Sequence, residues 1–131
     1  MALFNLHHYT GITALFFYDG KDRAKKYSAG WSKASLSKCI DIFAPGASGV
    51  VNEKKGKIIF KNQNSDYAVV YDYHGDYFRI QNTSNKSRRN YTDLDGNDMA
   101  NVTVNGKTRG RLKDEYQKAT HFLNEDNEDQ I

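Results

Sequence analysis

The sequence has few of the residues that cross-link a chain or break its secondary structure. Among its 131 residues there is one cysteine, Cys39, and one proline, Pro45. A single cysteine excludes an internal disulfide and any zinc site built from several cysteines. Because Cys39 lies with Leu36, Ile40 and Phe43 at helical spacing, we expect a buried core thiol rather than a catalytic nucleophile.

Long hydrophobic segments are also absent. No apolar run approaches the length of about 18 residues that a membrane-spanning helix needs. The opening stretch MALFNLHHYT lacks the basic region and long apolar run of a standard secretory signal. Hydrophobic residues make up 38% of the chain and the mean hydropathy is −0.80, so we expect a single domain, residues 1–131, with a modest core.

Acidic residues are concentrated at the end of the chain. The net charge is +3, but the segment NEDNEDQI (residues 124–131) holds four acids and no lysine or arginine. Residues 1–123 therefore carry 19 basic against 12 acidic groups, a net of +7. A basic body suggests an anionic partner such as nucleic acid, with plain solubility as the alternative explanation. We expect the acidic tail to be frayed and solvated.

The first third of the chain, residues 1–50, is expected to be mainly helical. Residues 22–29 fit a short helix closed by a glycine, and Ser35 is a suitable N-cap for a second helix that ends before Pro45. Residues 6–18 include the apolar run ITALFFY and fit either a strand or a buried helix, because periodicity does not separate the two.

Residues 55–105 change to the pattern of an antiparallel sheet. β-Branched and aromatic residues flank the turn His74–Asp76, which makes this hairpin the strongest local signal. The expected strands cover residues 57–61, 67–73 and 77–81, an edge strand at 91–94, and a short strand at 102–104 before the turn Asn105–Gly106. A helix over 111–123 completes an α+β fold, in which N-terminal helices pack on a small twisted sheet.

The final helix includes the stretch EYQKATHF, which ends in a Thr-His-Phe triplet. At the helical rotation of about 100° per residue, Tyr116, Ala119 and Leu123 fall within about 40° of Leu112 and form an apolar face. His121 falls about 180° away, on the polar side of the helix. The sequence therefore predicts that His121 does not belong to this packed face.

The helix has a second possible end. If it stops near Ala119, Thr120 and His121 are loop residues at the helix C-terminus, where the dipole favours a histidine. In both cases we expect His121 to be available to solvent or substrate. A surface or helix-capping histidine without catalytic function is the alternative.

A cation-rich loop, NKSRRNY (residues 85–91), follows the strand at 77–81. Together with Arg79 of that strand, the side chains here are suited to gripping a phosphate and stabilising a pentavalent phosphorane. The side chains in question are those of Lys86, Arg88, Arg89, Tyr91 and Thr92. A solvated loop is the alternative.

A second basic segment, NGKTRGR (residues 105–111), carries Lys107, Arg109 and Arg111. Its two glycines allow the backbone to approach a phosphodiester closely. This signal is weak when taken alone.

Metal ligation is not expected. His7 and His8 are adjacent and point to different faces of a strand, so they do not make a good metal pair. The sequence contains no H-x-x-x-H or H-E-x-x-H, and His74 is expected to be structural or exposed in its turn. We expect no cofactor.

These residue types suit RNA cleavage without a metal ion. The 2′-hydroxyl of RNA supplies the nucleophile, so the protein has to supply a base, an acid and cations for the phosphate. A histidine with arginine, lysine, tyrosine and threonine side chains on a small α+β scaffold meets this need. DNA lacks the 2′-hydroxyl, so the same set would serve it poorly.

Most of the chain after residue 30 resembles the C-terminal toxin domains of bacterial polymorphic toxins, the effector ends of contact-dependent growth-inhibition and Rhs/WapA-type proteins. The resemblance rests on a whole-domain pattern rather than one motif. The stretches that carry it are GWSKASLSKCIDIFAPGA, KGKIIFKN, VVYDYHGDYFRIQNTS, SRRNYTDLDGN and NGKTRGRLKDEYQKATHF.

The resemblance implies a tRNA-cleaving ribonuclease with a barnase/EndoU/colicin/RelE-like fold. It implies delivery from a producing cell, action in the cytoplasm of the target bacterium, and neutralisation by a cognate immunity protein. Some tRNA-cleaving members also require elongation factor Tu, which the residues themselves do not indicate. By this analogy His121, Thr120, Arg88, Arg89 and Tyr91 are the expected catalytic residues. The expected substrate-binding residues are Arg79, Lys86, Lys107, Arg109 and Arg111.

Two other functions fit the same sequence. One is a non-catalytic RNA- or protein-binding module that uses Tyr77, Phe78 and Arg79 on the sheet for stacking. The other is a metal-dependent DNase toxin, which needs clustered acids or histidines, whereas the aspartates here are scattered.

Overall fold

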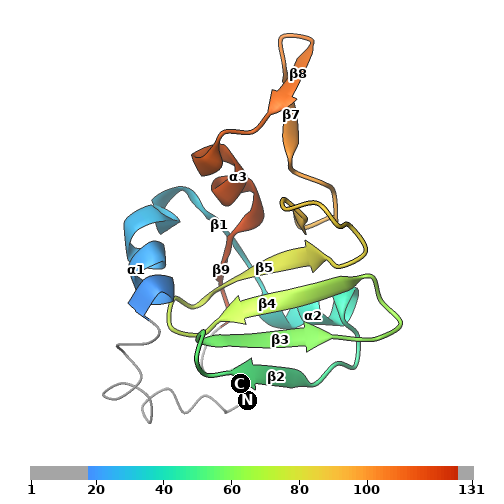
Figure 1. The fold of residues 1–131 in the computed structure, drawn as a ribbon. Coiled ribbons are helices and arrows are strands. Elements are labelled where there is room, and N and C mark those ends of the chain that lie inside the picture. Colours follow the sequence, from blue (N-terminus) through green and yellow to red (C-terminus); the bar gives the residue numbers. More distant parts are fainter. Residues whose placement is uncertain (1–17, 127–131) are drawn as a thin grey trace.

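The computed structural model of this chain describes residues 18–126 (Figure 1). The helices are α1 (Tyr18–Tyr27), the 3-10 helix η3 (Ser28–Gly30), α2 (Leu36–Phe43) and α3 (Lys113–Thr120). The strands are β1 (Ser32–Ala34), β2 (Gly49–Asn52), β3 (Lys57–Lys61), β4 (Tyr67–Asp72), β5 (Tyr77–Asn82), β6 (Tyr91–Thr92), β7 (Asn101–Val104), β8 (Lys107–Gly110) and β9 (Phe122–Asn124). Except for Tyr18, the segment expected to be a strand or a buried helix at residues 6–18 lies outside the described residues.

The strands form one mixed sheet and one separate hairpin. The sheet has seven strands in the order β1-β9-β5-β4-β3-β2, with β6 also paired to β5, while β7 and β8 pair only with each other. All pairs are antiparallel except β1 with β9, which are parallel. The expected α+β class, with N-terminal helices, a mostly antiparallel sheet and a C-terminal helix, is confirmed.

The predicted hairpin is formed by β4 and β5, and it lies in the middle of the sheet. Its register pairs Asp72 with Tyr77. The turn is held by Asp72, whose Oδ1 accepts hydrogen bonds from the backbone N–H of His74 at 3.2 Å and of Gly75 at 3.0 Å. A side chain at Gly75 would collide with the ring of Tyr77 and the backbone of Gly20, so this turn requires glycine.

One face of the sheet packs on α2 and forms the main core. Phe78 and Ile80 of β5 are fully buried there against Phe43 of α2 and Phe122 of β9. The hydroxyl of Ser35 accepts a hydrogen bond from the N–H of Lys38 at 3.2 Å, which confirms the expected N-cap. Cys39 is 6% exposed, so the prediction of a buried core thiol is also confirmed.

The opposite face of the sheet is more polar. Side chains alternate along a strand, so Tyr77, Arg79 and Gln81 of β5 project from this face, while Phe78 and Ile80 point to the core. Helices α1 and α3 lie on this side, near the β5–β9 end of the sheet (Figure 1). A second, smaller apolar cluster forms here from Ala24, Trp31 and Tyr77, with Leu123 packed against it.

The C-terminal segment differs from its prediction. Helix α3 ends at Thr120 rather than 123, and the chain continues as β9 between β1 and β5. Leu123 therefore packs from a strand, and Leu112 is 61% exposed rather than part of an apolar helix face. Strand pairing on both sides of β9 stabilises residues 122–124 more than a further turn of the short helix would. Helical periodicity in the sequence contains no information about that pairing.

The acidic tail is also ordered further than expected. The carboxylate of Asp126 accepts a hydrogen bond from the hydroxyl of Ser35 at 2.6 Å and from the N–H of Ser37 at 2.8 Å. An acid at this place complements the N-terminal dipole of α2. The prediction of a frayed tail is therefore wrong for its first residues, and residues 127–131 lie outside the described part.

Two further boundaries were misplaced. The region expected to be mainly helical contains the strands β1 and β2, and the edge strand predicted at residues 91–94 is only Tyr91–Thr92. Both strands of the hairpin β7–β8 are formed, although only the first was expected. Within residues 18–126, no helix is long and apolar enough to cross a membrane.

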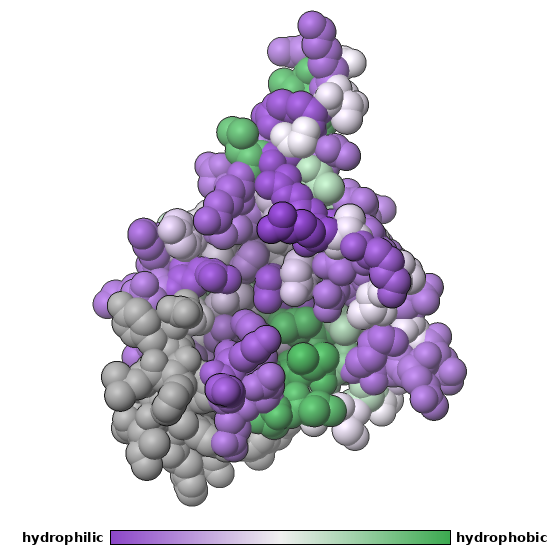
Figure 2. All heavy atoms as spheres, viewed as in Figure 1, coloured by the Kyte–Doolittle hydropathy of each residue, from purple (hydrophilic) through white to green (hydrophobic). Residues whose placement is uncertain are grey.

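Hydrophobic and hydrophilic side chains separate on the surface (Figure 2). Hydrophilic side chains predominate over α3 and the hairpin β7–β8. A hydrophobic patch lies low in the view, where Val50 of β2 and Ile59 of β3 are paired in register and are 68% and 36% exposed.

Candidate catalytic cluster on the sheet

His121 is buried, in contrast to the accessible histidine that the sequence predicted. It follows the last residue of α3 and precedes β9, and its side chain is 4% exposed. Thr120 beside it is fully buried, and its hydroxyl donates to the carbonyl of Tyr116 at 2.7 Å. Both side chains point inward because the chain enters the sheet as β9 directly after the helix.

The hydrogen bonds of His121 define its tautomer. Nδ1 lies 2.8 Å from the carbonyl oxygen of Gln117 and 3.2 Å from Oγ1 of Thr120. A carbonyl oxygen only accepts, so Nδ1 carries the proton and donates it to Gln117. Nε2 is then the nitrogen with the free lone pair. It is buried and has no hydrogen-bond partner among residues 18–126.

Two aromatic rings hold the imidazole. The ring of Trp31 lies 4.6 Å from that of His121, and the ring of Tyr77 lies 5.5 Å from it, measured between centroids. Trp31 and Tyr77 also contact each other edge to face at 5.0 Å. The imidazole is thus fixed by packing on the polar face of the sheet.

The surroundings keep His121 neutral. Burial is the largest cause that lowers its pKa, to about 3, followed by the positive charge of Arg79 and, more weakly, those of Arg23 and Lys57. The hydrogen bond to Gln117 opposes this shift in part. At neutral pH the group is therefore an imidazole with a lone pair on Nε2, in a region of positive potential.

Arg79 connects this histidine to the predicted phosphate-binding loop. Its guanidinium stacks on the ring of Tyr91, 4.1 Å from the centroid. The backbone N–H of Tyr91 donates to the hydroxyl of Tyr116 at 2.9 Å, which fixes β6 against α3. The structure thus brings Arg79, Tyr91, Thr120 and His121 together. We refer to Trp31, Tyr77, Arg79, Tyr91 and His121 together as the candidate catalytic cluster.

An ion pair that the sequence did not indicate lies beside the cluster. Lys57 and Asp72 are paired across β3 and β4, with Nζ 3.2 Å from Oδ2. Asp72 is 2% exposed, and burial lowers the pKa of Lys57 despite this partner. Burial and then the charge of Asp72 raise the pKa of Tyr77 to about 12, so its hydroxyl stays protonated. Only the register of the sheet could have located this pair.

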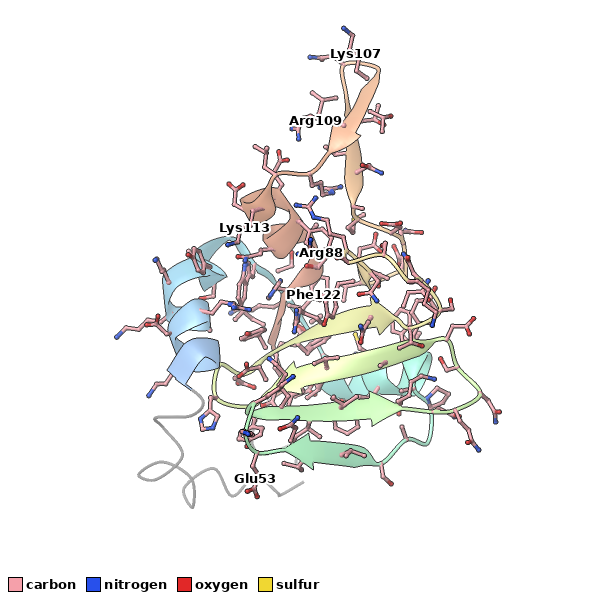
Figure 3. The ribbon with its side chains drawn as sticks, viewed as in Figure 1. Glu53, Arg88, Lys107, Arg109, Lys113 and Phe122 are labelled. Carbon is pink, nitrogen blue, oxygen red and sulfur yellow. The ribbon has the colours of Figure 1, made fainter. Side chains whose placement is uncertain are left out.

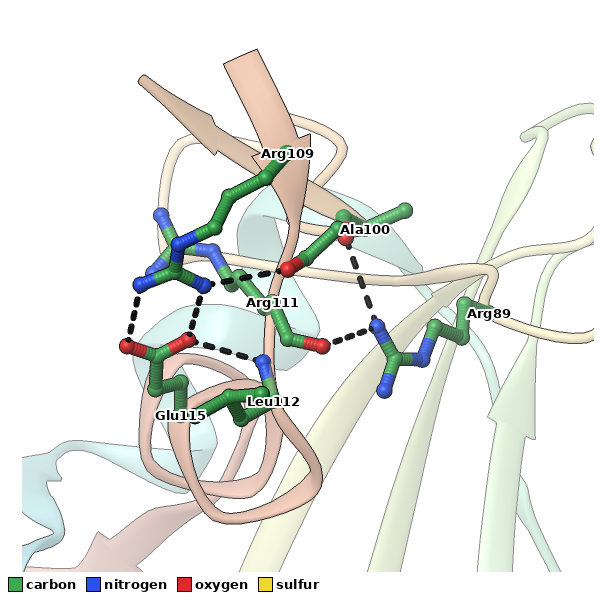
Figure 4. A network of polar contacts seen from close by, with 7 residues as sticks. Arg89, Ala100, Arg109, Arg111, Leu112 and Glu115 are labelled. Atoms are coloured by element: carbon green, nitrogen blue, oxygen red, sulfur yellow. Dashed lines mark hydrogen bonds and ion pairs between the residues drawn. The ribbon is translucent and has the colours of Figure 1, made fainter. Parts of the chain in front are cut away.

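Two of the predicted cationic residues make side-chain contacts at the base of the hairpin (Figure 4). Arg89 donates to the carbonyl of Arg111 at 2.6 Å and to that of Ala100 at 3.4 Å, and it stacks on the ring of Tyr116. Arg109 forms a two-pronged ion pair with Glu115, at 2.8 and 3.0 Å. These contacts tie the hairpin to α3. The hydroxyl of Thr92, also expected to grip a phosphate, is buried and donates to the carbonyl of Asp93.

Three other predicted cations are exposed, whereas Arg111 is half-buried. The side chains of Lys86, Arg88 and Lys107 form no hydrogen bond or ion pair with other residues in the described part of the chain. Lys107 lies at the tip of the hairpin, away from the sheet, whereas Arg88 lies near α3 (Figure 3). The structure therefore does not place Lys107 in the candidate catalytic cluster.

Among the described residues, no group of three or more histidine, cysteine, aspartate or glutamate side chains is arranged to hold a metal ion. His74 packs on the ring of Tyr73 at 4.7 Å, and His7 and His8 lie outside the described residues.

Comparison with protein-family models found no match, and comparisons with curated proteins and with solved structures found no significant match.

Proposed function

We propose that this protein is a metal-independent endoribonuclease. The observation that carries the proposal is His121, a buried neutral imidazole close enough to Arg79, Arg23 and Lys57 for their charges to lower its pKa. Its Nε2 has no hydrogen-bond partner among the residues that the structure describes. A lone pair of this kind accepts a proton, and the cations favour a phosphodiester next to it. Perturbed titratable groups of this type are concentrated at functional sites.

The proposed reaction uses the RNA's own hydroxyl. The 2′-oxygen forms a bond to phosphorus while the bond from phosphorus to the 5′-oxygen breaks. The proton of the 2′-hydroxyl passes to Nε2 of His121, and the 5′-oxygen takes a proton from solvent. The products are a 2′,3′-cyclic phosphate and a 5′-hydroxyl end. Arg79 stabilises the negative charge that builds up on the phosphoryl oxygens.

Substrate binding has to change the surroundings of His121. Its Nε2 is buried, so the 2′-hydroxyl reaches it only when the side chains over the ring move aside. Arg79 is half-buried and offers the first contact for a phosphate. A bound phosphate also offsets the positive charges that lower the pKa of His121, so the histidine becomes a stronger base when RNA is bound.

The resemblance to toxin domains supplies the biological part of the proposal. The substrate is tRNA, cut in the cytoplasm of a target bacterium after delivery from a producing cell. A cognate immunity protein neutralises the enzyme, and the basic body suits an acidic partner. A requirement for elongation factor Tu is tested by adding that factor to the reaction.

The test is incubation with total tRNA, with and without EDTA, followed by mapping of the product ends. We expect cleavage in both conditions and cyclic phosphate ends. His121→Asn retains a donor for the Gln117 carbonyl and should lower the rate at least about 100-fold, the typical contribution of a general base. His74→Asn is the matched control and should cleave at the wild-type rate. If folded His121→Asn cleaves normally, the site assignment is wrong.

The alternatives give different results in the same experiment. A non-catalytic module would bind RNA in a salt-dependent manner and leave it intact. Its expected stacking surface is not available, because Tyr77 and Phe78 are 1% and 0% exposed. A DNase toxin would cut plasmid DNA and lose that activity in EDTA.

A further inference from the structure

The hairpin β7–β8 stands apart from the rest of the protein. It projects beyond α3, away from the sheet (Figure 1). Every residue of β8 is exposed, and so are the residues of β7 except the half-buried Val102. A two-stranded ribbon is marginally stable by itself, so this one needs support from the body.

That support is concentrated at the base of the hairpin (Figure 4). The guanidinium of Arg89 bonds the backbone of both strand ends, at Ala100 and Arg111, and the N–H of Arg111 donates to the carbonyl of Ala100 at 2.9 Å. Glu115 accepts from Arg109 and, at 2.7 Å, from the N–H of Leu112. These contacts fix the direction of the hairpin relative to α3.

The second anchor joins the carboxylate of Glu115 to two donors, one from the hairpin and one at the start of α3. Hydrogen bonds from Arg109, and then from the N–H of Leu112, lower the pKa of Glu115 to about 2. Arg109 is therefore committed to the anchor, which leaves Lys107 as the free cation at the tip.

The surface of the hairpin suits an anionic partner. Residues 99–112 contain three cationic side chains and no acid. Lys107, Arg109 and Lys113 follow one another from the tip to the start of α3 (Figure 3). The hydroxyls of Thr103 and Thr108 lie 3.0 Å apart across the strands and offer hydrogen bonds to phosphate or ribose.

The tip of the hairpin lies far from His121, so only an extended or folded RNA could contact both. Helix α3 of eight residues spans about 12 Å, and the hairpin adds roughly 10 Å beyond its base, at 1.5 Å and about 3.3 Å per residue. His121 lies at one end of this arrangement and Lys107 at the other. A phosphate held by Lys107 therefore lies several nucleotides away from the one held at the cluster, or on a second strand.

We propose that the hairpin β7–β8 is the element that recognises folded RNA. It contacts the backbone of a structured region while the candidate catalytic cluster acts on a phosphodiester some distance away. A two-stranded ribbon is narrow enough to enter a groove, and its small hydroxyl side chains suit the wide, shallow minor groove of an RNA duplex with its 2′-hydroxyls. This inference rests on the proposed ribonuclease function.

The test compares two substrates. One is a folded tRNA, and the other is a six-nucleotide single-stranded RNA with the sequence around the mapped cut. Lys107→Glu should lower kcat/KM on the tRNA about tenfold and change it less than about twofold on the oligonucleotide. Lys38→Glu is the matched control, because Lys38 is exposed on α2 across the sheet and should leave both values unchanged. Equal losses on both substrates, or no loss, would overturn the proposal.

A binding measurement separates this proposal from the function that it rests on. In the same proteins, Lys107→Ala should reduce the slope of log Kd against log salt for tRNA by about one, the value for a lost phosphate contact. If the wild type cleaves neither substrate, the ribonuclease proposal fails. In that case the salt dependence of tRNA binding still tests the hairpin proposal. A slope that is the same in Lys107→Ala and the wild type would refute that proposal.

Discussion

Acidification should destabilise this protein through one buried histidine. His121 has a pKa of about 3 in the folded protein, against 6.5 in an unstructured chain. Below pH 6.5 the unfolded chain binds a proton there that the folded protein does not bind, so acid favours unfolding. The stabilisation from the neutral ring is complete above pH 6.5 and is lost as the pH falls toward 3.

The size of the effect follows from the shift. Each pH unit below 6.5 removes about 1.4 kcal/mol, so a change from pH 7 to pH 4.5 removes about 2.5 kcal/mol of unfolding free energy through this group. Such a loss is a large part of the 5–15 kcal/mol that stabilises a typical domain.

The assay is urea denaturation followed by circular dichroism at both pH values. Comparison of the wild type with His121→Asn cancels the titration of the carboxylates, which both proteins share. We expect the wild type to lose about 2.5 kcal/mol more than the variant between pH 7 and 4.5. His74→Asn should retain most of this loss. Equal losses in the wild type and His121→Asn, or an NMR titration midpoint above about 6 for the His121 ring, would refute the argument.

Three further predictions concern the fold and are measured by the same denaturation. Phe78→Ala should cost about 3–5 kcal/mol, because Phe78 is fully buried between α2 and β9, and a cost near zero would contradict the described core. Ser35→Ala should cost about 1 kcal/mol by removing the N-cap, whereas Ser35→Thr should recover most of it. Gly20→Ala places a Cβ that would overlap the carboxylate of Asp72, so its midpoint should fall, whereas Gly110→Ala has ordinary space around its Cβ and should be neutral.

Local signals in the sequence predicted the central elements well. The β4–β5 hairpin follows from alternating aromatic and β-branched residues around a glycine turn, and α2 follows from Ser35 and Pro45. Helices and hairpins of this kind depend on interactions between neighbours in the chain. The short strands β1 and β9 were missed because three residues carry no periodic pattern, and their pairing joins segments far apart in the sequence.

The candidate site was predicted by residue type rather than by position. Arg79, Tyr91 and His121 do come together, but the sequence could not show that β9 would bury the histidine. Lys57 and Asp72 were missed because only the sheet register brings them beside Tyr77. Arg89 was expected to be catalytic and Arg109 to bind substrate. Their side chains hold the hairpin, since a basic segment does not reveal which of its cations find a partner.

The parallel pairing of β1 with β9 has a consequence for the time at which the candidate site forms. Ser32 pairs with Phe122, and β9 separates β1 from β5, so the sheet is not complete until almost the whole chain is available. His121 directly precedes β9 and takes up its buried position only then. A ribosome that has released only the first hundred residues carries a chain without the imidazole and without its setting. If the proposed activity depends on this histidine, it therefore arises only after residues 122–124 have been made and paired, when an inhibitor can bind the folded surface.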